Sequence, residues 1–427
     1  MCIVTQMTRT PSGPPRHLIV AALVAFAAFG SFWGVWGASV PRVQHQAGIG
    51  DGQLGLALLF VGAGALPAML AAGRALDRWG LRVAAVLVGA LGVVGAGLAL
   101  TAVNLASLCV GLAVVGAVSG AADVAMNAVA GRAEQTARRP VITRAHGVFS
   151  SLVVLASLAT GVASAASLPL AVPFTAVAVL SLLAGAALLR TLPSGVDRAA
   201  EPASGPQHRT GADPAPSDRW RVVPFLLVGV LGALAFATEN AHQSWSAVFA
   251  HDELGSGPGL SAVAPAVFAG TVAVTRFATG GLEAAHARAV LLAGASAAAA
   301  GTALIAVAPT LLVAGVGLAV AAAGTAVLFP TLVGIVSRNV DESHRGRATS
   351  VVTTVSYLGF LAGPVYVGLW ADAVGLRGAL VAVAALAVGL FVLTPALLRL
   401  SGLGRRTGVT VDEVAPPVRD RMGQYAP

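Results

Sequence analysis

The chain has 427 residues, of which 56% are hydrophobic and only 10% are charged, and its formal net charge is +8 at pH 7. Soluble domains average about 25% charged residues, so this composition excludes a water-soluble body of this size. The mean hydropathy of +0.83 instead predicts an all-α membrane protein in contact with the lipid bilayer. The basic residues are spread between apolar runs, which argues against a nucleic-acid partner. Two cysteines make neither a disulfide framework nor a metal cluster, and we expect no metal and no cofactor.

Apolar runs of about 20 residues, each long enough to cross a bilayer, follow one another along the chain. The first begins after Arg16 and resembles a signal peptide, but further apolar runs follow it and no convincing cleavage site intervenes. We therefore predict twelve membrane-spanning helices, at residues 17–39, 53–73, 82–102, 105–131, 141–165, 169–190, 221–244, 258–280, 288–307, 309–337, 348–370 and 376–399.

The predicted helices divide into two sets of six. Residues 191–220 lie between the sets and carry five prolines among serine, glycine and charged residues, a composition typical of a flexible linker. We expect one six-helix bundle at 17–190 and a second at 221–400, flanked by tails at 1–16 and 401–427. Two repeated halves around a site near the middle of the membrane are common among secondary transporters.

The distribution of arginine predicts the topology. All 26 basic residues are arginines. If the N-terminus is placed in the cytoplasm and the helices alternate, every arginine except Arg42 and Arg377 falls on the cytoplasmic side. Cytoplasmic loops of membrane proteins carry an excess of positive charge. We therefore predict a multi-pass protein of the cell (inner) membrane with both termini and the linker in the cytoplasm, and we expect a monomer.

The turn between the second and third predicted helices has a recognisable pattern. It contains, in order, Gly73, Asp77, Arg78, Gly80 and Arg82. This segment resembles the signature loop of the major facilitator superfamily, Gly followed by Asp-Arg-x-Gly-x-Arg, and the two sets of six helices extend the resemblance to the whole chain. The resemblance implies two pseudo-symmetric six-helix bundles and a cytoplasmic gate. In that gate Asp77 would face residues 347–349 at the start of the eleventh helix, where the helix dipole stabilises an anion.

An ordinary charged turn is the alternative interpretation of this loop. The corresponding segment of the second half is weaker, since Glu283 has no adjacent basic residue.

Three further segments carry a narrower resemblance. They are Asp123 to Asn127, Arg139-Pro140 followed by His146 to Ser150, and Glu239 followed by Trp245-Ser246. Together they are similar to a bacterial branch of superfamily permeases related to fucose-permease-like sugar transporters. The chain departs from that branch at Ser244, where an acidic residue is usual. The proline-ending motif of drug/proton antiporters is missing from residues 141–165.

Two acidic residues lie inside predicted helices, where a charge costs about 2.5–3.5 kcal/mol or more and is therefore a candidate for function. Asp123 shares a helix face with Asn127, four residues on, and would bind a proton or a polar group of the solute. The alternative is a structural ion pair that holds the cytoplasmic gate. Its candidate partners are Arg74, Arg78 and Arg132.

Glu239 begins a polar stripe on the seventh predicted helix. His242, Gln243 and Ser246 follow it at spacings of three, four and seven residues, and Asn240 is adjacent. A polar stripe on a membrane helix is expected to face a wet cavity, where partial burial favours the neutral, proton-carrying form of a carboxyl. The alternative is a solvated stretch at the extracellular end of the helix.

Aromatic residues supply further cavity candidates. Trp33, Trp36 and Tyr357 lie in predicted helices, and in the resembled superfamily helices 1, 4, 7 and 10 line the path. For Trp245 and Trp370 a position at the membrane interface is the better interpretation. His146 would either titrate near the cytoplasmic face or make a structural hydrogen bond. Pro330 is expected to free a backbone carbonyl in the tenth helix.

The sequence favours a proton-coupled secondary transporter of a small polar solute, such as a sugar or related metabolite. An efflux pump for drugs or metabolites and a non-transporting membrane sensor are the alternatives. An enzyme is not expected, because no hydrolase, zinc-protease or nucleotide-binding motif is found in the sequence.

Overall fold

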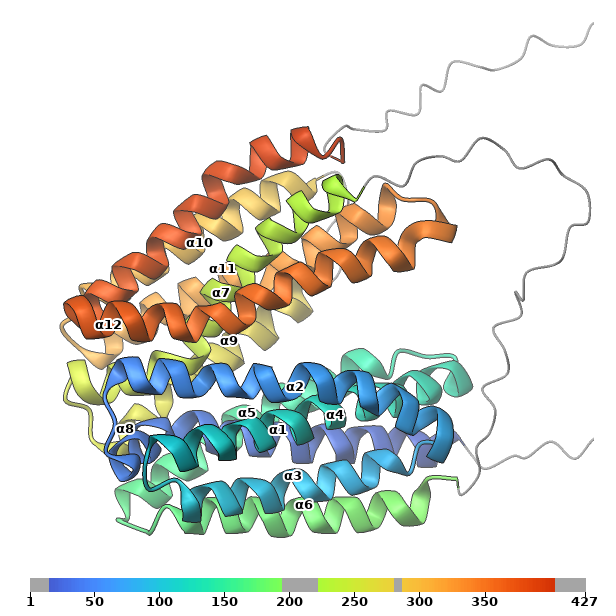
Figure 1. Cartoon of the computed structure of the whole chain (residues 1–427), viewed down its shortest axis with the longest axis horizontal. Helices are drawn as coiled ribbons and strands as arrows, with labels where there is room; N and C mark the ends of the chain where they lie inside the picture. The colour runs from blue at the N-terminus through green and yellow to red at the C-terminus, as the bar shows by residue number, and fades with distance from the viewer. Residues whose placement is uncertain (1–14, 194–221, 280–285, 404–427) are drawn as a thin grey trace, which may run out of the picture.

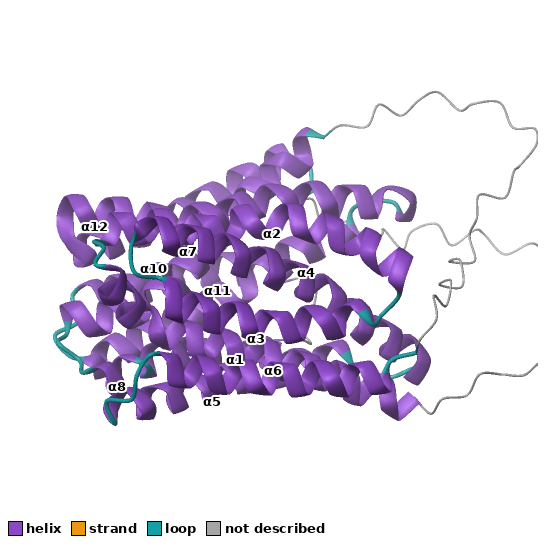
Figure 2. Ribbon diagram, turned by 60° about the horizontal axis from the view of Figure 1, so that its bottom comes forward, coloured by secondary structure: helices purple, strands orange, loops and turns teal. Residues whose placement is uncertain are grey.

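The computed structural model describes residues 15–193, 222–279 and 286–403. Within these ranges the regular structure is entirely helical, and the long helices lie roughly side by side (Figures 1 and 2). This confirms the predicted all-α class. Most of the predicted linker, nearly all of both tails and Glu283 lie outside the described residues, so the predictions about them stay predictions.

The first half of the chain forms helices close to the predicted positions. They are α1 (Pro15–Ala47), α2 (Asp51–Trp79), α3 (Val83–Thr101), α4 (Leu105–Ala137), α5 (Ile142–Ala165) and α6 (Ala171–Thr191). Several extend beyond the apolar run, because polar residues continue the helix outside the span. At the start of α4 the Asn104 side chain accepts a hydrogen bond from the Ser107 backbone N–H at 2.9 Å, a favourable N-cap.

The second half begins with α7, which continues into a short π-helical segment, and its predicted eighth span is split at Ala262. The elements are α7 (Val223–Val248), η1 (Phe249–Glu253), α8 (Pro258–Ser261), α9 (Val263–Thr279), α10 (Ala287–Ala306), α11 (Leu311–Arg338) and α12 (Glu342–Leu400).

The last helix is too long for one crossing. Its 59 residues would extend about 88 Å at 1.5 Å per residue, against about 30 Å of hydrocarbon. Gly375 interrupts it with φ 79° and ψ 167°, a backbone conformation that glycine adopts readily. Figure 1 shows the chain reversing there, between an orange first arm and a red second arm. The described residues contain 11 helices long and apolar enough to span a membrane, with α12 counted once; the twelfth crossing, its second arm, stays a prediction.

The two halves use corresponding helix pairs. In the first half α2 packs on α4 and α3 on α6, and in the second half α9 packs on α11 and α10 on α12. Glycines bring helix backbones together in both halves. A Cβ on Gly120 would lie 2.9 Å from Ala65, and one on Gly363 would lie 2.6 Å from the Ala237 carbonyl oxygen.

The ends of the helices differ in charge. We call the end with the turns at residues 80–82, 138–141 and 339–341 the arginine-rich end, and the end with the turns at 48–50 and 166–170 the opposite end. Arg42 lies near the opposite end. The structure holds no membrane, so the placement of the arginine-rich end in the cytoplasm stays a prediction.

Candidate transport site

A cavity of about 270 Å³ lies between the two halves. It is lined by residues of α1, α2, α4 and α5 from the first half, and of α7 and the first arm of α12 from the second. Asp123 and Glu239 both line it. They lie about 27 Å along α4 and about 24 Å along α7, respectively, at 1.5 Å per residue. The two acids therefore share one cavity near the middle of the membrane-spanning region.

Helix contacts close the two halves together at the opposite end. The Gly52 backbone N–H, in the first turn of α2, donates to the Asp372 carboxylate of α12 at 3.0 Å. A Cβ on Gly368 would lie 2.8 Å from the Asp51 carbonyl oxygen. On the other side of the molecule the Ser157 hydroxyl of α5 donates to the Ala262 carbonyl at 2.9 Å. These contacts join the two halves at this end.

Towards the arginine-rich end, α2 and α12 separate. Gly62 still packs against Leu361 of α12, whereas a Cβ on Gly73 would meet no atom within 4 Å. Leu70 is 72% exposed and Trp79 is 63% exposed. The interface between these helices therefore ends near the cavity, and the remainder of α2 lies apart from the second half.

Glu239 forms an ion pair that the sequence did not reveal. Its carboxylate accepts a hydrogen bond from the Arg276 guanidinium of α9 at 3.0 Å. Arg276 also donates to the Ala326 carbonyl of α11 at 3.4 Å. Pro330, four residues further along α11, has no N–H for that carbonyl, so the predicted free carbonyl exists and holds the partner of Glu239. The Glu239 side chain is 15% exposed and that of Arg276 is 48% exposed.

Asp123 has a different environment. Its carboxylate accepts a hydrogen bond from the Asn127 amide at 3.2 Å, and the same amide donates to the Asp123 carbonyl at 2.9 Å. The predicted shared face of these two residues is therefore confirmed. The alternative ion pair with an arginine of the inner loops is not formed in this conformation, in which the gate contact is also absent. Arg74 donates to the Leu70 carbonyl at 3.4 Å instead, and within the described residues Asp123 makes no salt bridge.

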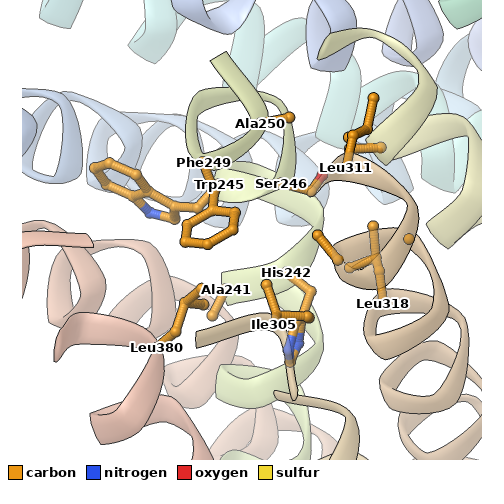
Figure 3. Close-up of a pocket in the computed structure, with 13 residues that line it drawn as sticks. Ala241, His242, Trp245, Ser246, Phe249, Ala250, Ile305, Leu311, Leu318 and Leu380 are labelled. Atoms are coloured by element: carbon orange, nitrogen blue, oxygen red, sulfur yellow. The ribbon is translucent and has the colours of Figure 1, made fainter. Parts of the chain in front are cut away.

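The polar stripe on α7 does not face one cavity, contrary to the prediction. Asn240, Gln243 and Ser244 line the central cavity with Glu239. His242 and Ser246 instead line a separate pocket of about 20 Å³ with Trp245 and Ile305 (Figure 3), which has room for roughly one water molecule.

His242 is held by hydrogen bonds within the second half. One ring nitrogen contacts the Thr238 carbonyl at 2.7 Å and the other the Thr302 hydroxyl at 2.9 Å. The ring also stacks on Phe268 at 6.1 Å between centroids. His242 therefore has a structural position, outside the cavity.

The predicted aromatic residues Trp33, Trp36 and Tyr357 all line the central cavity. Trp245 does not lie at an interface as expected: it is 1% exposed, and its indole N–H donates to the Pro364 carbonyl at 3.2 Å. The prediction for Trp245 was wrong because a tryptophan near the outer end of a membrane helix gives the same sequence pattern in two cases. It can lie at the membrane interface, or it can pack against another helix.

Two other cavity expectations differ from the structure. His146 is not among the described residues that line the cavity; its ring packs edge-on against Phe26 at 4.9 Å between centroids. The tenth predicted helix, α11, also contributes no described residue to the lining, although α2 and α5 do. Its contribution is indirect, through the carbonyl that holds Arg276.

Comparison with known proteins agrees with this architecture. The family model of the Major Facilitator Superfamily matches residues 21–285 and 282–421. The chain belongs to this superfamily. It is thus a multi-pass membrane transporter rather than an enzyme.

A relative in Yersinia pestis, described as an uncharacterized MFS-type transporter, is 28% identical over 78% of this chain and 83% of its own length. Among solved structures, a bacterial homolog of the human lysosomal transporter Spinster, in an inward-facing and unoccupied conformation, gives a TM-score of 0.70 at 16% identity over 93% of this chain and all of that one. A D-xylose-proton symporter gives 0.66 at 15% identity over 90% and 97%. At these identities the structures show the fold alone, and the narrower fucose-permease-like resemblance stays a prediction.

The superfamily signature loop is built as a tight turn. Gly80 has φ 70°, which favours glycine, and its N–H donates to the Leu76 carbonyl at 2.8 Å. Arg82 donates to the Leu192 carbonyl at 3.1 Å, which ties the loop to the end of α6, and Arg78 lies over the Trp79 ring at 5.6 Å.

The expected gate contact of Asp77 is not formed in this conformation. Within the described part of the chain Asp77 is exposed and makes no hydrogen bond or ion pair. The reason is the separation of α2 and α12 at the arginine-rich end. The structure therefore shows the loop in a form in which such a gate is open.

The two arginines outside the positive-inside pattern have structural roles. Arg42 donates to the Ser164 hydroxyl at 3.1 Å and to the Leu168 carbonyl at 2.7 Å, tying α1 to the end of α5. Arg377 donates to Glu253 at 3.1 Å and to the Ala306 carbonyl at 3.0 Å. Each arginine connects helices of its own half at the opposite end. This structural role explains why a positive charge is found at that end.

Proposed function

We propose that this chain is a secondary active transporter that moves a small organic solute by alternating access and couples its movement to protons. The single observation that carries the proposal is the ion pair, at 3.0 Å, between Arg276 and Glu239, an acid that lines a cavity shared by both halves. An ionisable pair inside a membrane protein is expensive to maintain and marks ion pathways.

The contacts between the halves support alternating access. At the opposite end Asp372 caps α2, and at the arginine-rich end α2 and α12 are apart. Rocking one half against the other would open the opposite end and close the arginine-rich end. The Asp372 contact would break, and Asp77 would approach the start of α12. If the arginine-rich end is cytoplasmic, as predicted, the present structure is the cytoplasm-facing state.

Proton coupling follows from the chemistry of the pair. A proton arriving through the cavity would bind the Glu239 carboxylate and neutralise it. Arg276 would then lose its ionic partner but keep the Ala326 carbonyl. The two access states would differ in the proton affinity of Glu239 where the rocking of the halves changes the burial or the Arg276 contact of its carboxylate. That difference is what links proton flow to the change of state.

For the solute we propose a class rather than a compound. The narrower sequence resemblance favours a small polar solute such as a sugar. The many aromatic rings in the cavity wall favour the second candidate, export of an amphipathic compound.

Counterflow in proteoliposomes tests the proposal. Vesicles loaded with one unlabelled solute of a panel of sugars, nucleosides, amino acids and amines would take up the labelled form, and an imposed pH gradient would change the accumulation. We expect counterflow for at least one class. Folded protein that gives none for any class would contradict transport.

A further inference from the structure

Several polar side chains of the central cavity are hydrogen-bonded within the protein. The Asn240 amide donates to the Phe360 carbonyl at 2.6 Å, and its oxygen accepts from the Ser244 hydroxyl at 3.2 Å. The Ser119 hydroxyl donates to the Gly116 carbonyl at 3.2 Å. Gln243 is the one uncharged amide of the lining with no intraprotein hydrogen bond among the described residues. The Tyr357 hydroxyl and the indole N–H groups of Trp33 and Trp36, which also line the cavity, make no hydrogen bond among the described residues either.

The charge of the cavity is unbalanced. Glu239 is paired with Arg276, so that pair is neutral as a unit. Asp123 has a neutral partner, Asn127, and the described residues that line the cavity include no basic side chain. An ionised Asp123 therefore leaves one uncompensated negative charge in a site where the protein supplies no counter-ion. A buried charge of this kind is stabilised only by a partner, and here the ligand or a proton must be that partner.

Aromatic rings from both halves line the same cavity as this carboxylate. Each half contributes one wall, and within each wall the rings touch one another: Phe29 contacts Phe149 at 5.9 Å between centroids, and Phe236 contacts Tyr357 at 5.7 Å. The walls consist of Phe29, Trp33 and Phe149 on one side and Phe236, Tyr357 and Phe360 on the other. Tyr357 of the second wall lines the same cavity as Asp123.

A carboxylate in a cavity lined by aromatic rings matches one ligand class. The faces of aromatic rings are negative and attract cations, and they recognise quaternary ammonium groups in particular. A neutral sugar could stack on the rings, but it would leave the charge of Asp123 without a partner. An anion would be repelled by it.

We propose that the central cavity binds a compact organic monocation, an amine or quaternary ammonium compound, with Asp123 as its counter-ion and the two aromatic walls as its cage. This inference rests on the proposed transport function and names the solute class for the same site. It replaces the sugar favoured by the sequence with the amphipathic class that was the alternative.

Protons and the cation compete for the same carboxylate. Asn127 on the same helix is hydrogen-bonded to Asp123, and the titratable groups that share its cavity are Tyr357 of α12 and Glu239 of α7, which is paired with Arg276 of α9. Protonation of Asp123 removes the charge that the cation needs, so binding of a cation with a fixed charge weakens as the pH falls.

An isostere pair tests the charge requirement directly. Choline and 3,3-dimethyl-1-butanol have nearly the same shape and differ in the positive charge. Equilibrium binding to the purified full chain, followed by tryptophan fluorescence, is expected to be at least tenfold tighter for choline and to weaken on acidification. Equal affinity for the two compounds, or choline binding that is unaffected by pH, would overturn the proposal.

Variants of Asp123 test whether this residue supplies the negative charge that the cation needs. Asp123→Asn is expected to lower choline affinity at least tenfold, and Asp123→Glu, which keeps the charge, to recover part of it. Asp252→Asn is the matched control, because Asp252 lies away from the cavity, beside His251 at 2.6 Å; its choline affinity is expected to equal that of the unmodified protein. Unchanged binding in a folded Asp123→Asn protein would refute the assignment.

The outcomes separate this inference from the transport proposal. Counterflow of a neutral sugar without choline binding would refute the cation site and leave transport standing. Choline binding without counterflow of any solute would support the cation site and contradict transport.

Discussion

Replacing Glu239 by glutamine is the sharpest test of proton coupling. Glutamine has nearly the same shape and can still accept the hydrogen bond from Arg276, now at 3.0 Å, but it cannot carry a proton. The ion pair is partly exposed, with side-chain exposures of 15% and 48%, so its stability lies between the roughly 0–1 kcal/mol of a surface pair and the several kcal/mol lost when a buried one is broken. Since only the charge on the acceptor is lost, we expect the variant to be destabilised by about 1 kcal/mol and to fold.

The expected effect on transport is much larger. A gradient of one pH unit supplies about 1.4 kcal/mol per proton, which supports roughly tenfold accumulation of a solute coupled to one proton. Glu239→Gln is expected to reduce this accumulation ratio to about 1. Exchange of labelled for unlabelled solute, which needs no net proton movement, is expected to continue. The assay is uptake into proteoliposomes with and without a pH gradient, at equal protein content.

The chain contains a matched control. Glu253 also pairs with an arginine, Arg377, at 3.1 Å, but it lies at the opposite end of the helices and does not line the cavity. Glu253→Gln makes the same chemical change and should leave the pH-driven accumulation ratio as it is. The reasoning is refuted if Glu239→Gln retains pH-driven accumulation, or if both variants lose it equally.

Three further variants test the gate and the packing. Asp372→Asn weakens the anionic cap on α2, worth about 0.5–2 kcal/mol, and is expected to raise labelling of the cavity from the opposite end roughly 2- to 30-fold; unaltered labelling would contradict the gate. Gly359→Val forces a side chain against the backbone of α7 and is expected to cost about 1–3 kcal/mol in thermal unfolding, whereas Gly315→Val, with nothing within 4 Å, serves as control. Thr302→Val removes a hydrogen-bond partner of His242; we expect about 1–3 kcal/mol lower stability with pH-driven uptake intact, and loss of coupling would place His242 in the proton path.

The helices could be predicted because the bilayer allows so few alternatives. A spanning segment must satisfy its own backbone hydrogen bonds and have a fixed minimum length, so apolar runs gave nearly all element positions. The same logic found Asp123 and Glu239, since a charge within an apolar run is conspicuous. That the two acids share one cavity was not predicted and is known only from the structure.

The partners of these acids could not be predicted in the same way. Arg276 lies 37 residues from Glu239 in the sequence and near the end of its helix, where an arginine is expected for topology alone. His242 was misplaced for a geometric reason. At 3.6 residues per turn it lies about 60° from Glu239 on one side of α7, whereas Gln243 lies about 40° away on the other. A sequence pattern does not show which side faces the cavity.

The gate loop illustrates a third limit. The pattern from Gly73 to Arg82 identifies the turn, and the structure adds the positive φ of Gly80. The pattern carries no information about which of two conformations is populated, because the same residues serve both. The absence of an Asp77 contact in the described residues could therefore be found only from the structure.

Access to the cavity from both sides tests the central claim most directly, and it requires no knowledge of the solute. Gln243 lines the cavity, and Gln243→Cys in a background of Cys2→Ala and Cys109→Ala would place the only thiol there. Labelling with a membrane-impermeant maleimide would be measured in vesicles of both orientations. The account predicts reaction from both sides, faster from the side of the arginine-rich end. Labelling from one side only, under all pH gradients, would contradict alternating access.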